Sequence, residues 1–197
     1  MATFGAYLRL DNGNVFVTPD ATPMCLYKRL ALTSADQTIA IPDGRPVMAF
    51  LRMNTDSICM TYRMSSSTLF VGAGNGTAYI FSVFPQTKPT WGMAIWNASG
   101  ELVLTNESKI LTDLVTVGEE GANGGIYIDQ YLTGSYAVCP QLLGAQVGQG
   151  SASIYTAAYY NGTTTRIHGI EAGSVYSPQG YINHGRSITA IKTDAYD

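Results

Sequence analysis

Charged side chains are scarce in this chain of 197 residues. Asp, Glu, Lys and Arg make up 13% of it, against about 25% in ordinary soluble domains, and the formal net charge is −3. Binding to nucleic acid needs a clustered Lys/Arg face that neutralises phosphates, whereas the 11 basic residues are scattered along the chain. The composition therefore argues against a nucleic-acid partner.

Long apolar runs are missing too. No window approaches the roughly 18 uninterrupted apolar residues that indicate a membrane-spanning helix. The opening segment MATFGAYLRL has neither the basic region nor the apolar region of a secretory signal. We therefore expect no membrane span, and synthesis in a cytoplasm without a visible export address.

Metal-binding and disulfide patterns are also lacking. The three cysteines, Cys25, Cys59 and Cys139, are widely spaced and lie among apolar neighbours, which favours buried structural thiols. The two histidines, His168 and His184, have no Cys or carboxylate at the spacing of a metal site, which usually has three or four protein ligands. The sequence predicts no metal ion and no cofactor.

Catalytic signatures are equally scarce. The segment VGAGNGT at 71–77 lacks the third glycine of a dinucleotide-binding loop and the Gly-Lys-Ser/Thr of a Walker loop, so we expect a turn between two strands there. No Gly-x-Ser-x-Gly motif marks a serine nucleophile. Carboxylates are available for a glycosidase pair, but nothing distinguishes them from solvated loop charges: Glu119, Glu120, Asp129 and Glu171. The sequence predicts no catalytic residue.

The pattern that is present has a period of two. Apolar residues alternate with polar ones in short runs separated by Gly and Pro clusters, which predicts many strands at spacings of roughly 8–12 residues and hence a β-sandwich or barrel. The predicted strands of the first half are 25–33, 38–42, 47–53, 58–64, 68–72 and 78–84.

Two segments are ambiguous. Residues 106–117 have fair helical spacing, but their β-branched content favours strand. The segment CPQLLGAQVG at 139–148 is short and broken by glycine, which predicts no more than a turn. The whole chain is predicted to be all-β, with little or no helix.

One unusual pattern occurs twice. FGAYLRLDNGNVFVT, Phe4 to Thr18, and WGMAIWNASGELVLT, Trp91 to Thr105, share an aromatic-Gly start, an apolar alternation, a polar turn that ends in Gly, a second alternation and a final Thr. Each predicts a β-hairpin, in which Gly13 or Gly100 supplies a turn position with positive φ. The match either reflects chance in a β-rich chain or marks two related units. The second interpretation predicts two antiparallel β-sandwich-like units in tandem, 1–90 and 91–197.

The same two stretches resemble a family of small proteins encoded among the tail genes of long-tailed, lambda-like bacteriophages. In that family an N-terminal yGi-x-l-x-n-x-dG hairpin is followed about halfway by sGyGl-x-v-x-n-x-sG-x-l-x-f, and Trp91 to Leu104 matches the second element well. One departure is Thr105-Asn106, where family members often carry Asp-Ser. The resemblance implies a β-sandwich virion component near the tail tip or central tail fibre. The family has no established activity, so it assigns no functional residue.

The last third of the chain is rich in tyrosine among Asn, Gln, Ser, Thr and Gly. Such a mixture is typical of recognition surfaces, although tyrosines also cap the rims of β-sandwiches. These tyrosines are Tyr127, Tyr131, Tyr136, Tyr155, Tyr159, Tyr160, Tyr176, Tyr181 and Tyr196. Within the group, the segment SPQGYINHGR and its surroundings predict a contact surface formed by Tyr176, Tyr181 and His184.

These observations lead to one main functional hypothesis and two alternatives. The first is a non-enzymatic structural or adhesive minor tail protein that contributes to tail assembly or host attachment. Its partners would be other tail proteins and a host surface receptor, and a homotrimer is the first oligomer to test. The second is a carbohydrate-binding or carbohydrate-degrading tail-tip protein. The third is a chaperone of tail or fibre assembly.

Overall fold

The computed structural model describes residues 8–9, 15–17 and 22–197. Strand accounts for 54% and helix for 2%, which confirms the predicted all-β fold. The helical element of the described residues is a 3-10 turn, η1 (Gly125–Tyr127). In this part of the chain no helix is long and apolar enough to cross a membrane.

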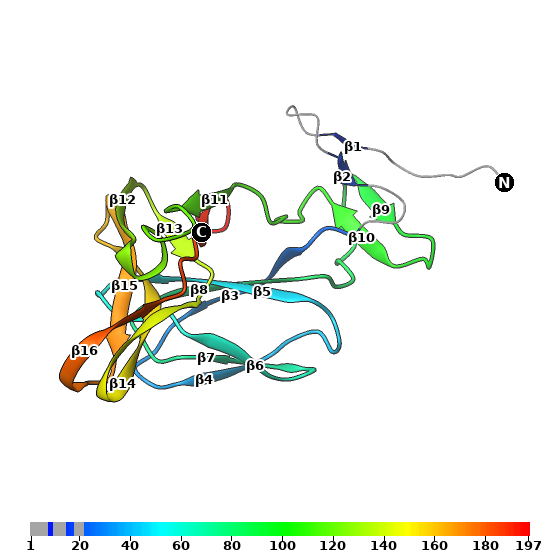
Figure 1. The fold of residues 1–197 in the computed structure, drawn as a ribbon. Coiled ribbons are helices and arrows are strands. Elements are labelled where there is room, and N and C mark those ends of the chain that lie inside the picture. The colour runs from blue at the N-terminus through cyan, green and yellow to red at the C-terminus, as the bar shows by residue number, and fades with distance from the viewer. Residues whose placement is uncertain (1–7, 10–14, 18–21) are drawn as a thin grey trace.

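Figure 1 shows the strands in chain order. They are β1 (Leu8–Arg9), β2 (Val15–Val17), β3 (Cys25–Ala31), β4 (Gln37–Ala40), β5 (Val47–Met53), β6 (Thr61–Ser65), β7 (Thr68–Val71), β8 (Gly76–Ser82), β9 (Ala94–Trp96), β10 (Leu102–Thr105), β11 (Leu114–Val117), β12 (Asp129–Thr133), β13 (Tyr136–Val138), β14 (Leu142–Tyr160), β15 (Thr164–Ala172), β16 (Tyr176–Asn183) and β17 (Ile188–Lys192).

Two layers of strands pack against each other in the first half of the chain (Figure 1). In one layer β8 is hydrogen-bonded between β3 and β5, and the other layer is the three-stranded sheet β4-β7-β6. Side chains of a strand alternate between its faces, so each layer contributes every second residue to the space between them. Ile39, Leu51, Leu69, Val71 and Ile80 belong to the same buried cluster. The β-sandwich-like arrangement follows from this alternation.

Strand β8 is buried on both faces. All seven of its residues are buried, because Ala78 and Ile80 enter the core between the layers while Tyr79 and Phe81 enter a second, aromatic core. The ring of Tyr196 packs edge-on against Phe81 with 4.9 Å between the ring centroids. Tyr196 is therefore a core residue, unlike the exposed rim position expected for the tyrosines of the last third.

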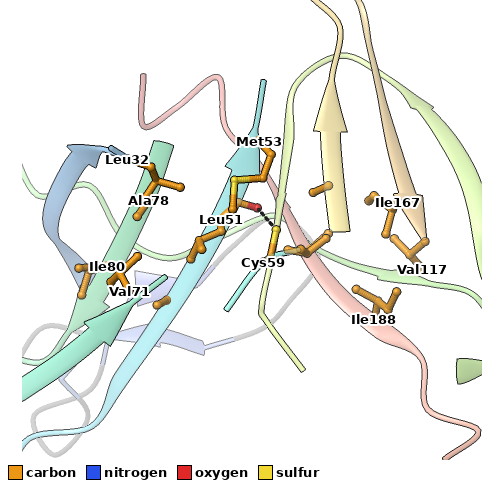
Figure 2. Close-up of a cluster of buried hydrophobic side chains, with 14 of the residues drawn as sticks. Leu32, Leu51, Met53, Cys59, Val71, Ala78, Ile80, Val117, Ile167 and Ile188 are labelled. Atoms are coloured by element: carbon orange, nitrogen blue, oxygen red, sulfur yellow. Dashed lines mark hydrogen bonds between the residues drawn. The ribbon is translucent and has the colours of Figure 1, made fainter. Parts of the chain in front are cut away.

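Sheet pairing and core packing both cross residue 90 instead of staying within two tandem units. Strand β5 pairs with β13 at Leu51–Val138, so strands from both sides of that position form one ten-stranded sheet. Figure 2 shows Leu51 from the first half and Ile167 and Ile188 from the second half in one buried cluster. Strand β8 explains the arrangement, since a strand with two apolar faces needs cover on both sides.

The repeated pattern forms two antiparallel strands at both places. Strands β9 and β10 pair antiparallel, and Gly100 in the connecting turn has φ 78°, as predicted. Strands β1 and β2 also pair antiparallel, while Phe4 and Gly13 lie outside the described residues. Gly92 has φ 114° and lies against the side chain of Asn106, so a side chain at this position would be strained and would overlap Asn106.

Strand β14 corrects the turn predicted at 139–148, because most of that segment belongs to the longest strand of the chain. Its first part pairs with β16 and its second part with β15. A straight strand would separate Leu143 from Ile154 by roughly 35 Å at about 3.3 Å per residue. A Cβ atom on Gly169 would nevertheless lie 3.3 Å from Leu143 and 2.9 Å from Ile154. Strands β14, β15 and β16 therefore form a folded ribbon that packs on itself.

Candidate functional site

The three residues of the predicted contact surface lie on or next to β16. Tyr176 is 75% exposed and Tyr181 is 53% exposed. Gln146 Nε2 donates a hydrogen bond of 2.9 Å to the Tyr181 hydroxyl. The backbone N–H of His184 donates to Leu143 O at 2.9 Å, and its side chain is exposed. The fold therefore places all three residues along β16 and its end. Their role in contact stays a prediction.

A backbone irregularity lies next to Tyr176. The β14–β16 register shifts between Val147 and Gln149, opposite Ser177, which has φ 50°. A non-glycine residue in this left-handed region costs about 1–2 kcal/mol. A Cβ atom on Gly148 would lie 2.5 Å from Ser177 O, so the backbones of β14 and β16 approach each other closely here.

The glycine-rich loop, residues 118–125, packs tightly against residues 183–186. Gly121 N donates to Gly185 O at 2.8 Å and Gly125 N donates to Arg186 O at 2.9 Å. A Cβ atom on Gly124 would overlap Glu119 O, and one on Gly185 would lie 2.7 Å from Gly121 O. The glycines therefore permit close backbone contact and keep the loop compact.

Asn183 joins this loop to the ribbon, and no sequence pattern singled it out. Its Nδ2 donates to the carbonyl oxygens of Ala122 at 3.3 Å and Gly124 at 3.1 Å. Its Oδ1 accepts from the backbone N–H of Ile126 at 3.2 Å and of Gly185 at 2.9 Å. One amide thus satisfies four backbone groups and joins the end of the loop to β16.

A hollow of about 230 Å³ lies between the glycine-rich loop and β12. The Tyr127 ring on its border is 63% exposed. The remaining lining is polar apart from the buried side chain of Ile128. The other side chains that line it are Glu119, Asn123, Asp129 and Gln130, all exposed.

Asp129, at the edge of the hollow, is held by Arg166 of β15. The guanidinium donates from Nε at 2.8 Å and from Nη2 at 2.7 Å to the two carboxylate oxygens. These hydrogen bonds hold the pKa of Asp129 below its usual value. A carboxylate that is paired in this way stays ionised and is a poor proton donor.

Buried His168 continues the ionic network. Its Nε2 lies 2.7 Å from Asp56 Oδ1 and its Nδ1 lies 3.1 Å from Gly169 O. Both ring nitrogens therefore lie against oxygen atoms. The described residues contain no group of three or more His, Cys, Asp or Glu side chains arranged to hold a metal ion.

Two of the three cysteines are buried, as predicted. Cys25 and Cys59 are buried and Cys139 is half-buried. Burial raises the pKa of Cys59 to about 12 and that of Cys25 to about 11. Because the thiolate is the reactive form, neither of these thiols is a nucleophile near neutral pH.

A second polar cluster gathers at Asp197. Its carboxylate accepts hydrogen bonds from Tyr79, Thr193, Arg29 and Arg52, the two arginines at 3.0 Å each. Burial alone would raise the pKa of Asp197, but these hydrogen bonds and the charge of Arg52 lower it below its usual value. The cluster connects β3, β5 and β8 to the residues after β17 and is structural.

The β9–β10 hairpin presents a different kind of surface. Its own small core contains Ile95, Val103 and Leu104. Trp91 is 79% exposed and Trp96 is 51% exposed. Figure 1 shows the hairpin standing apart from the two strand layers.

No protein-family model, curated protein or solved structure matches the chain.

Proposed function

We propose that the chain is a non-enzymatic structural or adhesive component of a bacteriophage tail, located at the tail tip or the central tail fibre. It contributes there to tail assembly or host attachment. The proposal rests on the hairpin Trp91 to Thr105, which carries the family resemblance and forms the β9–β10 hairpin. Its site of synthesis is the host cytoplasm and its final location is the virion.

The observation that supports binding is the apolar outer surface of this hairpin. Trp91, Met93 and Trp96 are exposed together on one short element, whereas Val103 and Leu104 on the second strand are buried. Apolar groups that are exposed close together mark interaction sites, and tryptophan is a frequent anchor of protein interfaces. We assign this surface to contact with another tail protein, in a homotrimer bound to the central fibre.

Receptor contact is assigned to a different element. Tyr176 and Tyr181 on the folded ribbon are exposed, and Ile182 beside Tyr181 is exposed too. The distance between the two elements in Figure 1 lets assembly and attachment use separate surfaces. Nucleic acid and membrane lipid are not partners in this proposal.

The test is incorporation of variant protein into particles. The variant W91S/W96S removes both exposed rings, and Tyr62→Ser, which removes an exposed ring from β6, is the matched control. We expect the double variant to fold and to be lost from purified particles at least about tenfold, because truncating an aromatic anchor costs about 2 kcal/mol or more. Equal incorporation of the double variant and the control would overturn the proposal.

Carbohydrate recognition is a second candidate, favoured by the polar hollow beside Tyr127. Binding fits it better than cleavage. A glycosidase needs a carboxylic acid with a raised pKa, whereas the pKa of Asp129 is lowered by Arg166. An assembly chaperone remains the reading to adopt if the protein is made but not retained in particles.

A further inference from the structure

We infer that the hollow between the glycine-rich loop and β12 binds one neutral sugar unit of a surface glycan. The inference rests on the attachment function proposed above, and it adds a ligand class and a site whose lining does not include Tyr176 or Tyr181. The ring of Tyr127 is the apolar platform, and the side chains of Asn123 and Gln130 are the hydrogen-bonding groups.

Size is the first argument. Pockets for drug-sized molecules measure about 300–1,000 Å³, whereas the hollow measures about 230 Å³. A single pyranose ring suits this smaller space, while the rest of a chain would extend into solvent. Two of the residues that line the hollow have large apolar side chains. The aromatic side chain of Tyr127 is 63% exposed, whereas the side chain of Ile128 is buried.

Chemical complementarity is the second argument. A sugar presents C–H groups on the faces of its ring and hydroxyl groups around its edge. An amphipathic aromatic ring packs against the C–H face. Primary amides both donate and accept, so Asn123 and Gln130 can serve a hydroxyl in either role. The lining contains both kinds of group.

The charged side chains that line the hollow indicate which class of sugar it binds. Asp129 is ionised but neutralised by Arg166, whose Nη2 lies 2.7 Å from it. Glu119 adds an exposed carboxylate to the lining. An acidic sugar would meet this carboxylate and be repelled, so the site favours neutral hexoses and N-acetylhexosamines.

Preorganisation is the third argument. The wall that carries Glu119 and Asn123 is fixed by the hydrogen bonds Gly121 N to Gly185 O and Gly125 N to Arg186 O. Asn183 holds the same loop through hydrogen bonds to Ala122 O and Gly124 O, and it also accepts one from the backbone N–H of Ile126 directly after the loop. A rigid wall reduces the conformational entropy lost on binding, which matters for a ligand as small as one sugar.

The experiment measures saturation transfer from the isolated full chain to methyl glycosides of glucose, galactose, mannose and N-acetylglucosamine, with N-acetylneuraminic acid as the acidic comparison. We expect transfer to at least one neutral sugar, with Kd of about 1 mM, and none to the acidic sugar. Absence of transfer to all four neutral sugars would overturn the inference.

Three variants locate the binding. Tyr127→Ala should weaken it at least about tenfold, which corresponds to loss of the aromatic platform, while Tyr62→Ala on β6 should leave Kd unchanged. Glu119→Gln should retain neutral sugars within about twofold and admit the acidic sugar, because only the charge is removed. Equal effects of Tyr127→Ala and Tyr62→Ala, or continued rejection of the acidic sugar by Glu119→Gln, would contradict the assignment.

The sugar-binding experiment and the particle experiment can fail independently of each other. A chain that is found in particles but binds no sugar refutes the hollow and leaves the tail assignment intact. A chain that binds sugar but is missing from particles supports the hollow and refutes the tail assignment.

Discussion

The β9–β10 hairpin and the folded ribbon are both built from antiparallel strands, but they bury their apolar side chains in different ways. The ribbon turns back on itself, so that Leu143 and Ile154 are buried in the core shared with the rest of the chain. The hairpin keeps a small core of its own and leaves Trp91 and Trp96 exposed. The ribbon is therefore part of the scaffold, and the hairpin has a surface to offer to a partner.

The largest difference is expected from one methyl group added to each element. In Gly144→Ala the new Cβ overlaps the carbonyl oxygen of Ile182, so we expect a loss of about 3 kcal/mol in the free energy of unfolding. In Gly100→Ala the Cβ meets no atom within 4 Å and only the positive φ is unfavourable, at about 1 kcal/mol. Urea denaturation monitored by circular dichroism measures both. Equal losses would show that the ribbon is not tightly folded.

An amide substitution in each element gives the next effect. Asn183→Ala leaves four backbone groups without their partner, two in the glycine-rich loop and the N–H groups of Ile126 and Gly185, at a cost of about 2–3 kcal/mol. Asn97→Ala removes the bonds that its Oδ1 accepts from Ser99 and Glu101 in the exposed hairpin turn, at about 1 kcal/mol. Differential scanning calorimetry separates the two. A smaller effect at Asn183 than at Asn97 would contradict the role given to the loop.

The free energy of unfolding should also depend on pH through Asp197, which joins β3, β5 and β8 to the residues after β17. Its pKa is depressed in the folded chain, so its contribution is present above the ordinary carboxyl pKa and is lost as pH falls through the folded value. Asp197→Asn should cost about 1–2 kcal/mol at pH 7. The difference from wild type should shrink below about pH 4. Denaturation curves of both proteins across this range provide the measurement, and a pH-independent difference would refute the linkage.

The smallest effect is expected where the hairpin touches the layers. Arg45 and Glu101 form an exposed ion pair at 3.3 Å. Exposed pairs contribute about 0–1 kcal/mol, so Glu101→Gln should change the free energy of unfolding by less than about 0.5 kcal/mol. A larger loss of the free energy of unfolding in the same denaturation assay would mean that this ion pair anchors the hairpin firmly to the scaffold, which would contradict the comparison made above.

Local signals explain which elements the sequence predicted. Strand β5 has the predicted bounds, and β8 is recognisable from its short apolar run. Both signals are patterns of neighbouring residues, so they can be read from the sequence alone. The turn at Gly100 is readable for the same reason, since positive φ is a property of one residue. The hollow was not predicted, although Glu119 and Asp129 were noted as carboxylates.

Long-range contacts explain what was missed. Gly144 and Gly148 resemble strand breakers, but each makes room for the β16 backbone, a partner far along the chain. Asn183 has its role only because the glycine-rich loop arrives beside it. The Leu51–Val138 pairing that joins the halves has no local signature either, so the repeated hairpin suggested a division that the sheet does not follow.

The measurement that tests the central claim most directly is quantitative mass spectrometry of purified phage particles. The account predicts that the chain is retained in the particle at a copy number of three or a multiple of three, at a level matching known tail proteins of the same particle. Presence in the infected-cell lysate with loss from purified particles would contradict it.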